Sequence, residues 1–171
     1  MRTTLLLTVV GADRTGLIES LAHKIAAVGG NWEESRMGRL AGQFAGIVLV
    51  TVDSERADQL VAELRGLESA GLQVTARTVA PPSTQAGGTR VKLEVTGGDR
   101  PGIVHKVARV LAHQGVNVEE LESAVGSAPM SGEALFRARA RLLVPASVEL
   151  SDVRSALEAL GTEFMVDLVP E

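Results

Sequence analysis

The chain contains no cysteine and no tyrosine, and its aromatic residues are one tryptophan and three phenylalanines among 171 residues. Without cysteine there are no disulfides, no thiolate zinc sites, no iron–sulfur clusters and no cysteine nucleophile. Four aromatic rings offer little surface on which nucleic-acid bases stack. The net charge of −4 adds no attraction to nucleic acid. We therefore expect a protein that does not bind nucleic acid directly.

Long hydrophobic runs are missing as well. No segment approaches the roughly 18 uncharged apolar residues of a membrane span. The first ten residues lack the small-residue cleavage site of a signal peptide, so we expect a cytoplasmic location. A composition with 45% hydrophobic and 22% charged residues is typical of a globular protein and excludes a disordered or fibrous chain.

The sequence does contain an internal repeat. The segment Gly11–Ile18 (GADRTGLI) returns as Gly97–Val104 (GGDRPGIV), a shift of 86 residues (97 − 11). Phe44 matches Phe136 at a shift of 92 (136 − 44), which places extra residues of the second copy around 126–133, where a loop absorbs them cheaply. Further matches at the first shift are Ala22 with Ala108, Gly29 with Gly115, Asn31 with Asn117, and Glu33-Glu34 with Glu119-Glu120.

The repeat divides the chain into two domains of similar length. Residues 81–89 contain two prolines and two glycines without apolar periodicity, which is typical of a linker. We therefore predict domains at 1–80 and 90–171. Neither half has a net positive charge, so neither resembles a basic nucleic-acid-binding arm.

Each copy predicts the same order of elements, strand–helix–strand–strand–helix–strand. In the first copy, the expected elements are a strand 3–10, a helix 17–28, strands 31–40 and 44–52 joined by a turn at 41–43, a helix from Ser54 to Leu67, and a strand 73–79. In the second copy, they are a strand 90–96, a helix 101–114, strands 117–125 and 134–144, a helix 151–160 and a strand 162–169.

This order predicts an α+β fold made of two tandem ferredoxin-like βαββαβ domains. Right-handed crossovers fold each copy into a four-stranded antiparallel sheet with both helices on one face. The other sheet face and the strand edges then need a cover. We therefore expect a dimer or side-by-side packing of copies.

The turn between the first strand and the first helix of each copy is the best candidate site. Its glycines permit positive φ and close backbone approach, and Pro101 suits the first position of a helix. Backbone amides at a helix N-terminus attract a carboxylate, while Asp13 and Asp99 are placed to accept hydrogen bonds from an ammonium group. An α-amino acid is a sensible ligand. The residues alone favour the alternative, in which Asp13 or Asp99 bonds nearby N–H groups and the turn is only a tight, capped connection.

Two asparagines add to this site. Asn31 and Asn117 begin the second strand of each copy, a position that we expect near the turn, where an amide can contact both ends of an amino acid. An ordinary turn asparagine explains them equally well. The adjacent Glu33-Glu34 and Glu119-Glu120 are expected to alternate across a strand, so only one glutamate of each pair can face inward. Solvent-facing or edge-protecting charges are a more common role for them than an acid/base pair.

No residue pattern argues for catalysis, a metal or a cofactor. Arg137, Arg139 and Arg141 share one sheet face. They could grip a phosphate or an acidic partner, but the residues favour a plain solvent-exposed sheet face or pairing with Glu119 or other carboxylates on neighbouring strands. His23, His105 and His113 have no histidine at the matching repeat positions, and we expect them to be exposed on helices. Nucleophile elbows, zinc-protease motifs and phosphate loops are missing from the sequence.

The repeated Gly-x-Asp-Arg-(Thr/Pro)-Gly turn with its Gly-x-Asn resembles tandem ACT domains. Asn31–Met37 (NWEESRM) and the insertion Ala128–Gly132 (APMSG) resemble the glycine-cleavage-system transcriptional repressor family more closely. The resemblance covers nearly the whole chain. Thr15 departs from the proline that is usual at its position.

The resemblance implies a non-catalytic regulator that senses an amino acid, with glycine or serine favoured, and that represses through a DNA-binding partner protein. In ACT domains, the ligand lies between the turn of one unit and strand residues of a neighbour. Carried over here, the ligand-binding residues are Gly11, Asp13, Arg14, Thr15, Gly16, Leu17 and Asn31, and Gly97, Asp99, Arg100, Pro101, Gly102, Ile103 and Asn117.

Two other functions stay open. One is an interaction module that binds no ligand and uses its open sheets for assembly. The other is a small acylphosphatase-like hydrolase, for which Arg14 and Arg100 are the only candidate arginines in the first turns; neither copy offers a convincing base or nucleophile.

Overall fold

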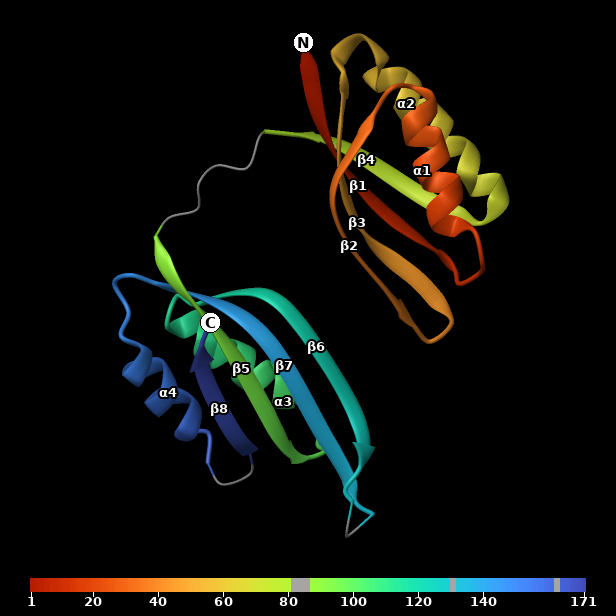
Figure 1. The fold of residues 1–171 in the computed structure, drawn as a ribbon. Helices are drawn as coiled ribbons and strands as arrows, with labels where there is room; N and C mark the ends of the chain where they lie inside the picture. The colour runs from red at the N-terminus through yellow and green to blue at the C-terminus, as the bar shows by residue number, and fades with distance from the viewer. Residues whose placement is uncertain (81–86, 130–131, 162–163) are drawn as a thin grey trace. The chain divides into compact units, whose positions relative to one another are not determined.

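The computed structural model describes residues 1–80, 87–129, 132–161 and 164–171, which form two compact units, Met1–Ser83 and Thr84–Glu171 (Figure 1). Each unit has the predicted strand–helix–strand–strand–helix–strand order. Residues 81–86 of the expected linker lie outside the described residues, and Gly88 and Thr89 already belong to the first strand of the second unit. None of the helices in the described ranges is long and apolar enough to cross a membrane.

The first unit is a four-stranded antiparallel sheet in the order β2-β3-β1-β4. Its elements are β1 (Arg2–Ala12), α1 (Leu17–Ala27), β2 (Asn31–Leu40), β3 (Gln43–Asp53), the 3₁₀ helix η1 (Ser54–Arg56), α2 (Ala57–Arg65), the 3₁₀ helix η2 (Gly66–Ala70) and β4 (Leu72–Val79).

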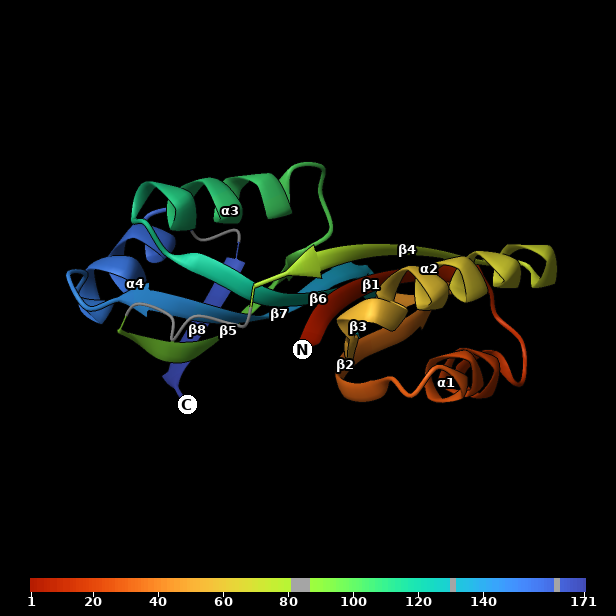
Figure 2. The same cartoon turned by 90° about the horizontal axis from the view of Figure 1, so that it is seen from above.

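The second unit repeats this topology in the order β6-β7-β5-β8. Its elements are β5 (Gly88–Gly98), α3 (Ile103–His113), β6 (Asn117–Ser127), β7 (Ala134–Pro145), α4 (Leu150–Glu158) and β8 (Phe164–Pro170). The described helices of each unit lie on the same face of its sheet (Figures 1 and 2). The α+β fold of two ferredoxin-like units is confirmed.

Several boundaries differ from the predicted ones by one to three residues. The strands run longer than their predicted apolar stretches, because the ladders continue past them, over Arg2 and Ala12 in β1 and over Gly88 and Gly98 in β5. The predicted helix start at Pro101 is wrong: α3 begins at Ile103, after Gly102 with φ +90°. The turn predicted at 41–43 is present, with Ala41 (φ 49°) and Gly42 (φ 76°) both left-handed, as a tight hairpin requires.

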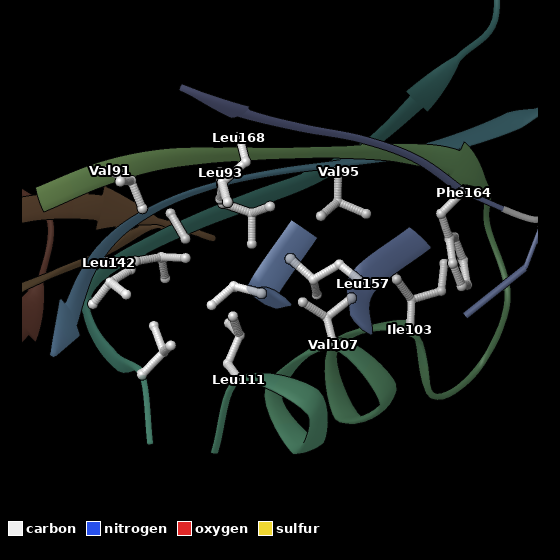
Figure 3. Close-up of a cluster of buried hydrophobic side chains, with 14 of the residues drawn as sticks. Val91, Leu93, Val95, Ile103, Val107, Leu111, Leu142, Leu157, Phe164 and Leu168 are labelled. Carbon is white, nitrogen blue, oxygen red and sulfur yellow. The ribbon is translucent and has the colours of Figure 1, made fainter. Parts of the chain in front are cut away.

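Each unit has its own hydrophobic core between its sheet and its two helices. In the first core, β1 contributes Leu5, Leu7 and Val9, which alternate with residues on the opposite sheet face. In the second, β5 contributes Val91, Leu93 and Val95, shown packed over α3 in Figure 3. Because the sheet alternates, the residues between these positions form a second face turned away from the helices, which we call the outer face.

Candidate functional site

The two βα turns have nearly the same backbone geometry. Gly16, at the N-terminus of α1, has φ 90° and ψ 1°, and Gly102, at the N-terminus of α3, has φ 90° and ψ 5°. An L-residue with a side chain adopts this left-handed conformation only under strain. Both turns therefore depend on glycine at their last residue.

Neither helix N-terminus has a side-chain cap within the described part of the chain. The expectation that Asp13 and Asp99 cap the helices is wrong. The carbonyl groups of Gly16 and Gly102 accept the first helical bonds, from the N–H groups of Ser20 and Lys106, each at 2.9 Å. The N–H groups that precede Ser20 in α1 and Lys106 in α3 have no carbonyl partner within the helix. A capping side chain would normally accept hydrogen bonds from them.

Backbone bonds hold each turn against the neighbouring hairpin. The N–H of Asp13 donates to the carbonyl oxygen of Gly42 at 2.9 Å, and the N–H of Asp99 donates to that of Ala134 at the same distance. In the first unit, the Arg14 guanidinium also donates to the carbonyl oxygen of Ala70. These bonds fix the backbone of both aspartates, and the Asp13 carboxylate also accepts a long bond of 3.4 Å from Arg39.

The remaining turn residues divide into packing and exposed positions. Leu17 and Ile103 are buried in the two cores, so only their backbone groups are available to a ligand. Gly11 is buried too, and a Cβ there would lie 2.4 Å from the carbonyl oxygen of Gly71. Its role is close approach to β4. The predicted residues that are exposed are Asp13, Arg14, Thr15 and Gly16, and Asp99, Arg100, Pro101 and Gly102; Gly97 is half-buried.

The expectation that the asparagines lie near the turn of their own unit is wrong. Asn31 pairs with Thr51, which pairs with Thr4, seven residues before Gly11 along β1. At about 3.3 Å per residue this separation is roughly 23 Å. Asn117 likewise lies level with Arg90, at the opposite end of β5 from Gly97. The helix carries the chain back along the sheet before the second strand begins.

A β-bulge changes how the paired glutamates point. The ladder between β2 and β3 shifts between Trp32 and Glu34, and that between β6 and β7 shifts between Val118 and Glu120. Glu33 binds the outer-face hydroxyl of Thr51, and Glu34 pairs with Leu49 on the same face. Both glutamates therefore lie on the outer face. The expected alternation is wrong because the bulge inserts one residue.

Glu33 is the hydrogen-bonding centre of this strand start. Its Oε1 accepts a bond of 2.6 Å from the Thr51 hydroxyl and one of 2.9 Å from the Asn31 amide. These donors hold the pKa of the Glu33 carboxyl below its usual range, the Thr51 bond contributing most. The Asn31 amide is thus engaged by its own strand.

Replacement of Glu33 gives a pH-dependent effect on stability. Because the folded-state pKa is lowered, the stabilisation is complete above the unfolded carboxyl pKa of about 4.3 and is lost as the pH falls through the folded-state pKa. Urea unfolding followed by Trp32 fluorescence should therefore show Glu33→Gln to be less stable than the wild type at neutral pH, with the difference shrinking in acid. An equal difference at both pH values would contradict the assignment.

The arginine stripe of β7 is largely paired. Arg139 Nε lies 3.0 Å from Glu94 Oε1, and Arg141 Nη1 lies 3.0 Å from Glu120 Oε1. Arg141 Nε also lies 2.9 Å from Glu171 Oε1, and these partners raise the pKa of Arg141. Pairing with carboxylates on neighbouring strands is confirmed for these two residues, although Glu119 itself pairs with Arg90. Arg137 has no ion pair within the described residues.

The histidines are exposed on α1 and α3, as expected. Over the described ranges, no group of three or more histidine and carboxylate side chains could hold a metal ion.

An apolar cavity of about 40 Å³ in the second unit, between α3 and the sheet, was not predicted from the sequence. Val104, Val118 and Leu121 line it and are partly exposed. In the first unit, Trp32 stands at the position equivalent to Val118 and packs against the core. The exchange of tryptophan for valine between the copies was the signal available in the sequence.

Comparison with known proteins identifies the repeated unit. Two models of the ACT domain match the chain, one over residues 3–77 and one over residues 86–161. The chain is also similar to the glycine cleavage system transcriptional repressor of Escherichia coli (strain K12), with 28% identity over 163 residues, 94% of this chain and 85% of that protein.

Solved structures share the fold over the full length. The crystal structure of an unknown protein from Galdieria sulphuraria has 30% identity and a TM-score of 0.88, covering 100% of this chain and 99% of that one. A crystal structure provisionally assigned as a glycine cleavage system transcriptional repressor has 18% identity, a TM-score of 0.74 and the same coverage. The chain therefore belongs to the ACT-domain family: it is a regulatory protein of two tandem ACT domains, related to the glycine cleavage system transcriptional repressor.

Proposed function

We propose that this protein is a non-catalytic sensor of a small amino acid, with glycine or serine favoured, and that it regulates transcription through a protein partner rather than by binding DNA. The name of its Escherichia coli relative supports a role in repression. The acidic chain with few aromatic residues supports action through a protein.

The observation that carries the proposal is the matched pair of uncapped helix N-termini. At Gly16 and Gly102 the same left-handed glycine opens a helix, and no side chain of the described residues caps it. The first-turn N–H groups and the helix dipole suit a carboxylate. Asp13 and Asp99, which precede these glycines in the turns and are fixed by backbone bonds to the hairpin, are suited to an ammonium group. An α-amino acid carries both charges.

A site that uses both the turn and the asparagine needs two ACT domains. Within one unit, Asn31 and Gly11 are separated by roughly 23 Å of strand, too far for one small ligand. We infer that the ligand lies where the turn of one ACT domain meets the second-strand asparagine of another, in the same chain or in a second copy. Asn31 would then exchange its bond to Glu33 for one to the ligand.

Such a site couples binding to domain arrangement. A ligand held by two domains stabilises the arrangement in which its two halves meet, and a partner that recognises only one arrangement responds to the ligand. Linkage requires the partner to change the ligand affinity by the same factor.

Thermal unfolding against the twenty amino acids tests this function. A ligand that binds only the native state stabilises it by about 2.7 kcal/mol at a concentration 100 times its dissociation constant. We expect a selective rise of melting temperature with glycine or serine, confirmed by calorimetry. If no amino acid gives a thermal shift or a calorimetric signal, an interaction module without a ligand is favoured instead.

Matched variants locate the site. Asp99→Ala and Asn117→Ala in one set, and Asp13→Ala and Asn31→Ala in the other, should reduce the shift without lowering the melting temperature of the free protein by a similar amount. Gln59→Ala, at an exposed amide on α2, is the control and should keep the full shift. Unchanged binding in all four site variants would contradict the assignment.

A further inference from the structure

The outer face of the first unit has an uncharged centre. On the two central strands, β1 and β3, the residues between the buried core positions are all uncharged from Thr4 to Ala12 and from Gln43 to Thr51. Apart from Ala12 at the end of β1, the apolar ones on this face, together with Val79 of β4, form what we call the apolar face: Leu6, Val10, Ala45, Ile47, Leu49 and Val79.

The apolar face is continuous and partly open. Leu6 lies directly opposite Leu49, and Thr8 lies opposite Ile47. Leu6, Ile47 and Leu49 line a hollow with Val79 and Ala80 on one side and with Glu34, Ser35 and Arg36 of the edge strand β2 on the other. Ile47 is 42% exposed and Val10 is 39% exposed, while Leu6 and Leu49 are half-buried by their neighbours on the sheet.

The equivalent face of the second unit is charged. By the repeat shifts, Leu6 corresponds to Lys92, Ile47 to Arg139 and Leu49 to Arg141. Arg139 pairs with Glu94 at 3.0 Å, and Arg141 pairs with Glu120 and Glu171. These charged groups are thus satisfied by one another. Covering this face with another protein would remove solvent from the charged groups. The desolvation free energy would then exceed the Coulomb attraction within the ion pairs.

We propose that the apolar face of the first unit is the dimer interface of this protein, covered by the same face of a second copy, while the charged face of the second unit stays in water. The proposal goes beyond amino-acid sensing and does not depend on it. An uncharged centre surrounded by polar residues is the usual anatomy of a protein interface.

The charges at the rim suit a second copy. Glu34 and Arg36 lie on the edge strand β2, 2.7 Å apart, and Arg77 lies on the opposite edge strand β4. A twofold axis between the two sheets can lie across the strands or along them. An axis across the strands places β2 over β2 of the other copy in the reverse direction, and an axis along the strands places β2 over β4 of the other copy. In the first arrangement, an axis that passes between Glu34 and Arg36 sets Glu34 against Arg36 of the other copy. In the second, Glu34 faces Arg77 of the other copy, because both lie level with the Leu6–Leu49 pair. The same surface is then complementary to itself.

The whole outer face of the first unit, the apolar face together with its polar rim on β2 and β4, has the size that a stable dimer needs. Four strands about 4.8 Å apart, each with roughly eight residues at about 3.4 Å, give a flat area of about 500 Å². Two such faces bury about 1,000 Å², and more when projecting side chains are counted, which reaches the range of specific interfaces. Sheets that pack in this way lie about 10 Å apart.

Transplanting the charges of the second unit tests the interface. Ile47→Arg introduces the residue that the same fold accepts at position 139. Val169→Arg, at a valine of β8 that is 49% exposed on the outer face of the second unit, is the matched control. Sedimentation equilibrium of the full chain over a wide concentration range should give twice the 17.9 kDa chain mass for the wild type and the control. Ile47→Arg should raise the dimer dissociation constant about a hundredfold or more.

Thr8→Glu, which introduces the counterpart of Glu94 opposite Ile47, covers the case in which Ile47→Arg does not fold. Circular dichroism identifies folded variants. The proposal is overturned if the wild type is a monomer at every concentration, if the folded variants of the apolar face remain dimers, or if Val169→Arg weakens the dimer equally. Dimers of the wild type and the control beside monomers of the folded Ile47 or Thr8 variant support it.

Discussion

Replacing Leu7 with alanine lowers the free energy of unfolding of the first unit by about 3 to 5 kcal/mol. Leu7 is fully buried at the centre of β1, between Val48 of β3 and Ala76 of β4, and under the helices. Loss of its branched end leaves a cavity that a rigid sheet cannot close. Urea unfolding followed by Trp32 fluorescence measures this loss, because the chain has a single tryptophan and it packs against this core.

Leu93→Ala is the matched variant of the second unit. Leu93 is the repeat counterpart of Leu7 and is 2% exposed in the second core (Figure 3). Each core consists of residues of one unit, so Leu93→Ala should leave the Trp32 transition in place while part of the circular dichroism signal is lost earlier. Equal movement of the Trp32 transition in both variants would show instead that the two units unfold as one.

Gly11→Ala should destabilise the first unit by about 2 to 3 kcal/mol, although alanine normally lowers the entropy of the unfolded chain and so favours folding. The added Cβ would lie 2.4 Å from the carbonyl oxygen of Gly71 and 3.1 Å from Leu72 Cδ1. The nearer atom is backbone, so β4 must move away from β1 to admit it. Trp32 fluorescence in urea is again the measurement.

Gly38→Ala is its control in the same unit. Gly38 is an exposed strand residue on β2, and apart from its chain neighbours no described atom lies within 4 Å of the place that an added Cβ would take. We expect a change of no more than about 0.5 kcal/mol, in either direction. Similar losses for the two variants would mean that Gly11 matters for its backbone freedom rather than for the close approach.

The element order and the sheet topology could be predicted because two independent signals agreed. The apolar spacing of each segment defined its type, and the repeat required both copies to fold alike. The turn at Ala41-Gly42 needed only local chemistry. The start of α3 was misplaced because Pro101 suits a first helical position, whereas Gly102 takes the left-handed conformation and delays the helix to Ile103.

The site was less predictable because it depends on register. A bulge of one residue puts Glu33 and Glu34 on the same face, and nothing in the local sequence marks it. The separation of Asn31 from Gly11 follows only from the paired strands. The two glycine turns could be located from the sequence, because glycine at their last residue is needed for a left-handed backbone. The side-chain cap expected from Asp13 and Asp99 was wrong, since no side chain of the described residues caps either helix.

The contrast between the two outer faces has a consequence for the valence of assembly. A chain with an adhesive sheet face on each of its two units could join neighbour to neighbour without end, and such open chains grow into fibres. Ion pairs such as Arg139–Glu94 leave the second unit non-adhesive on this side. If the proposed interface is the one adhesive face of the chain, association stops at two, and the duplicated domain gives a closed pair instead of a polymer.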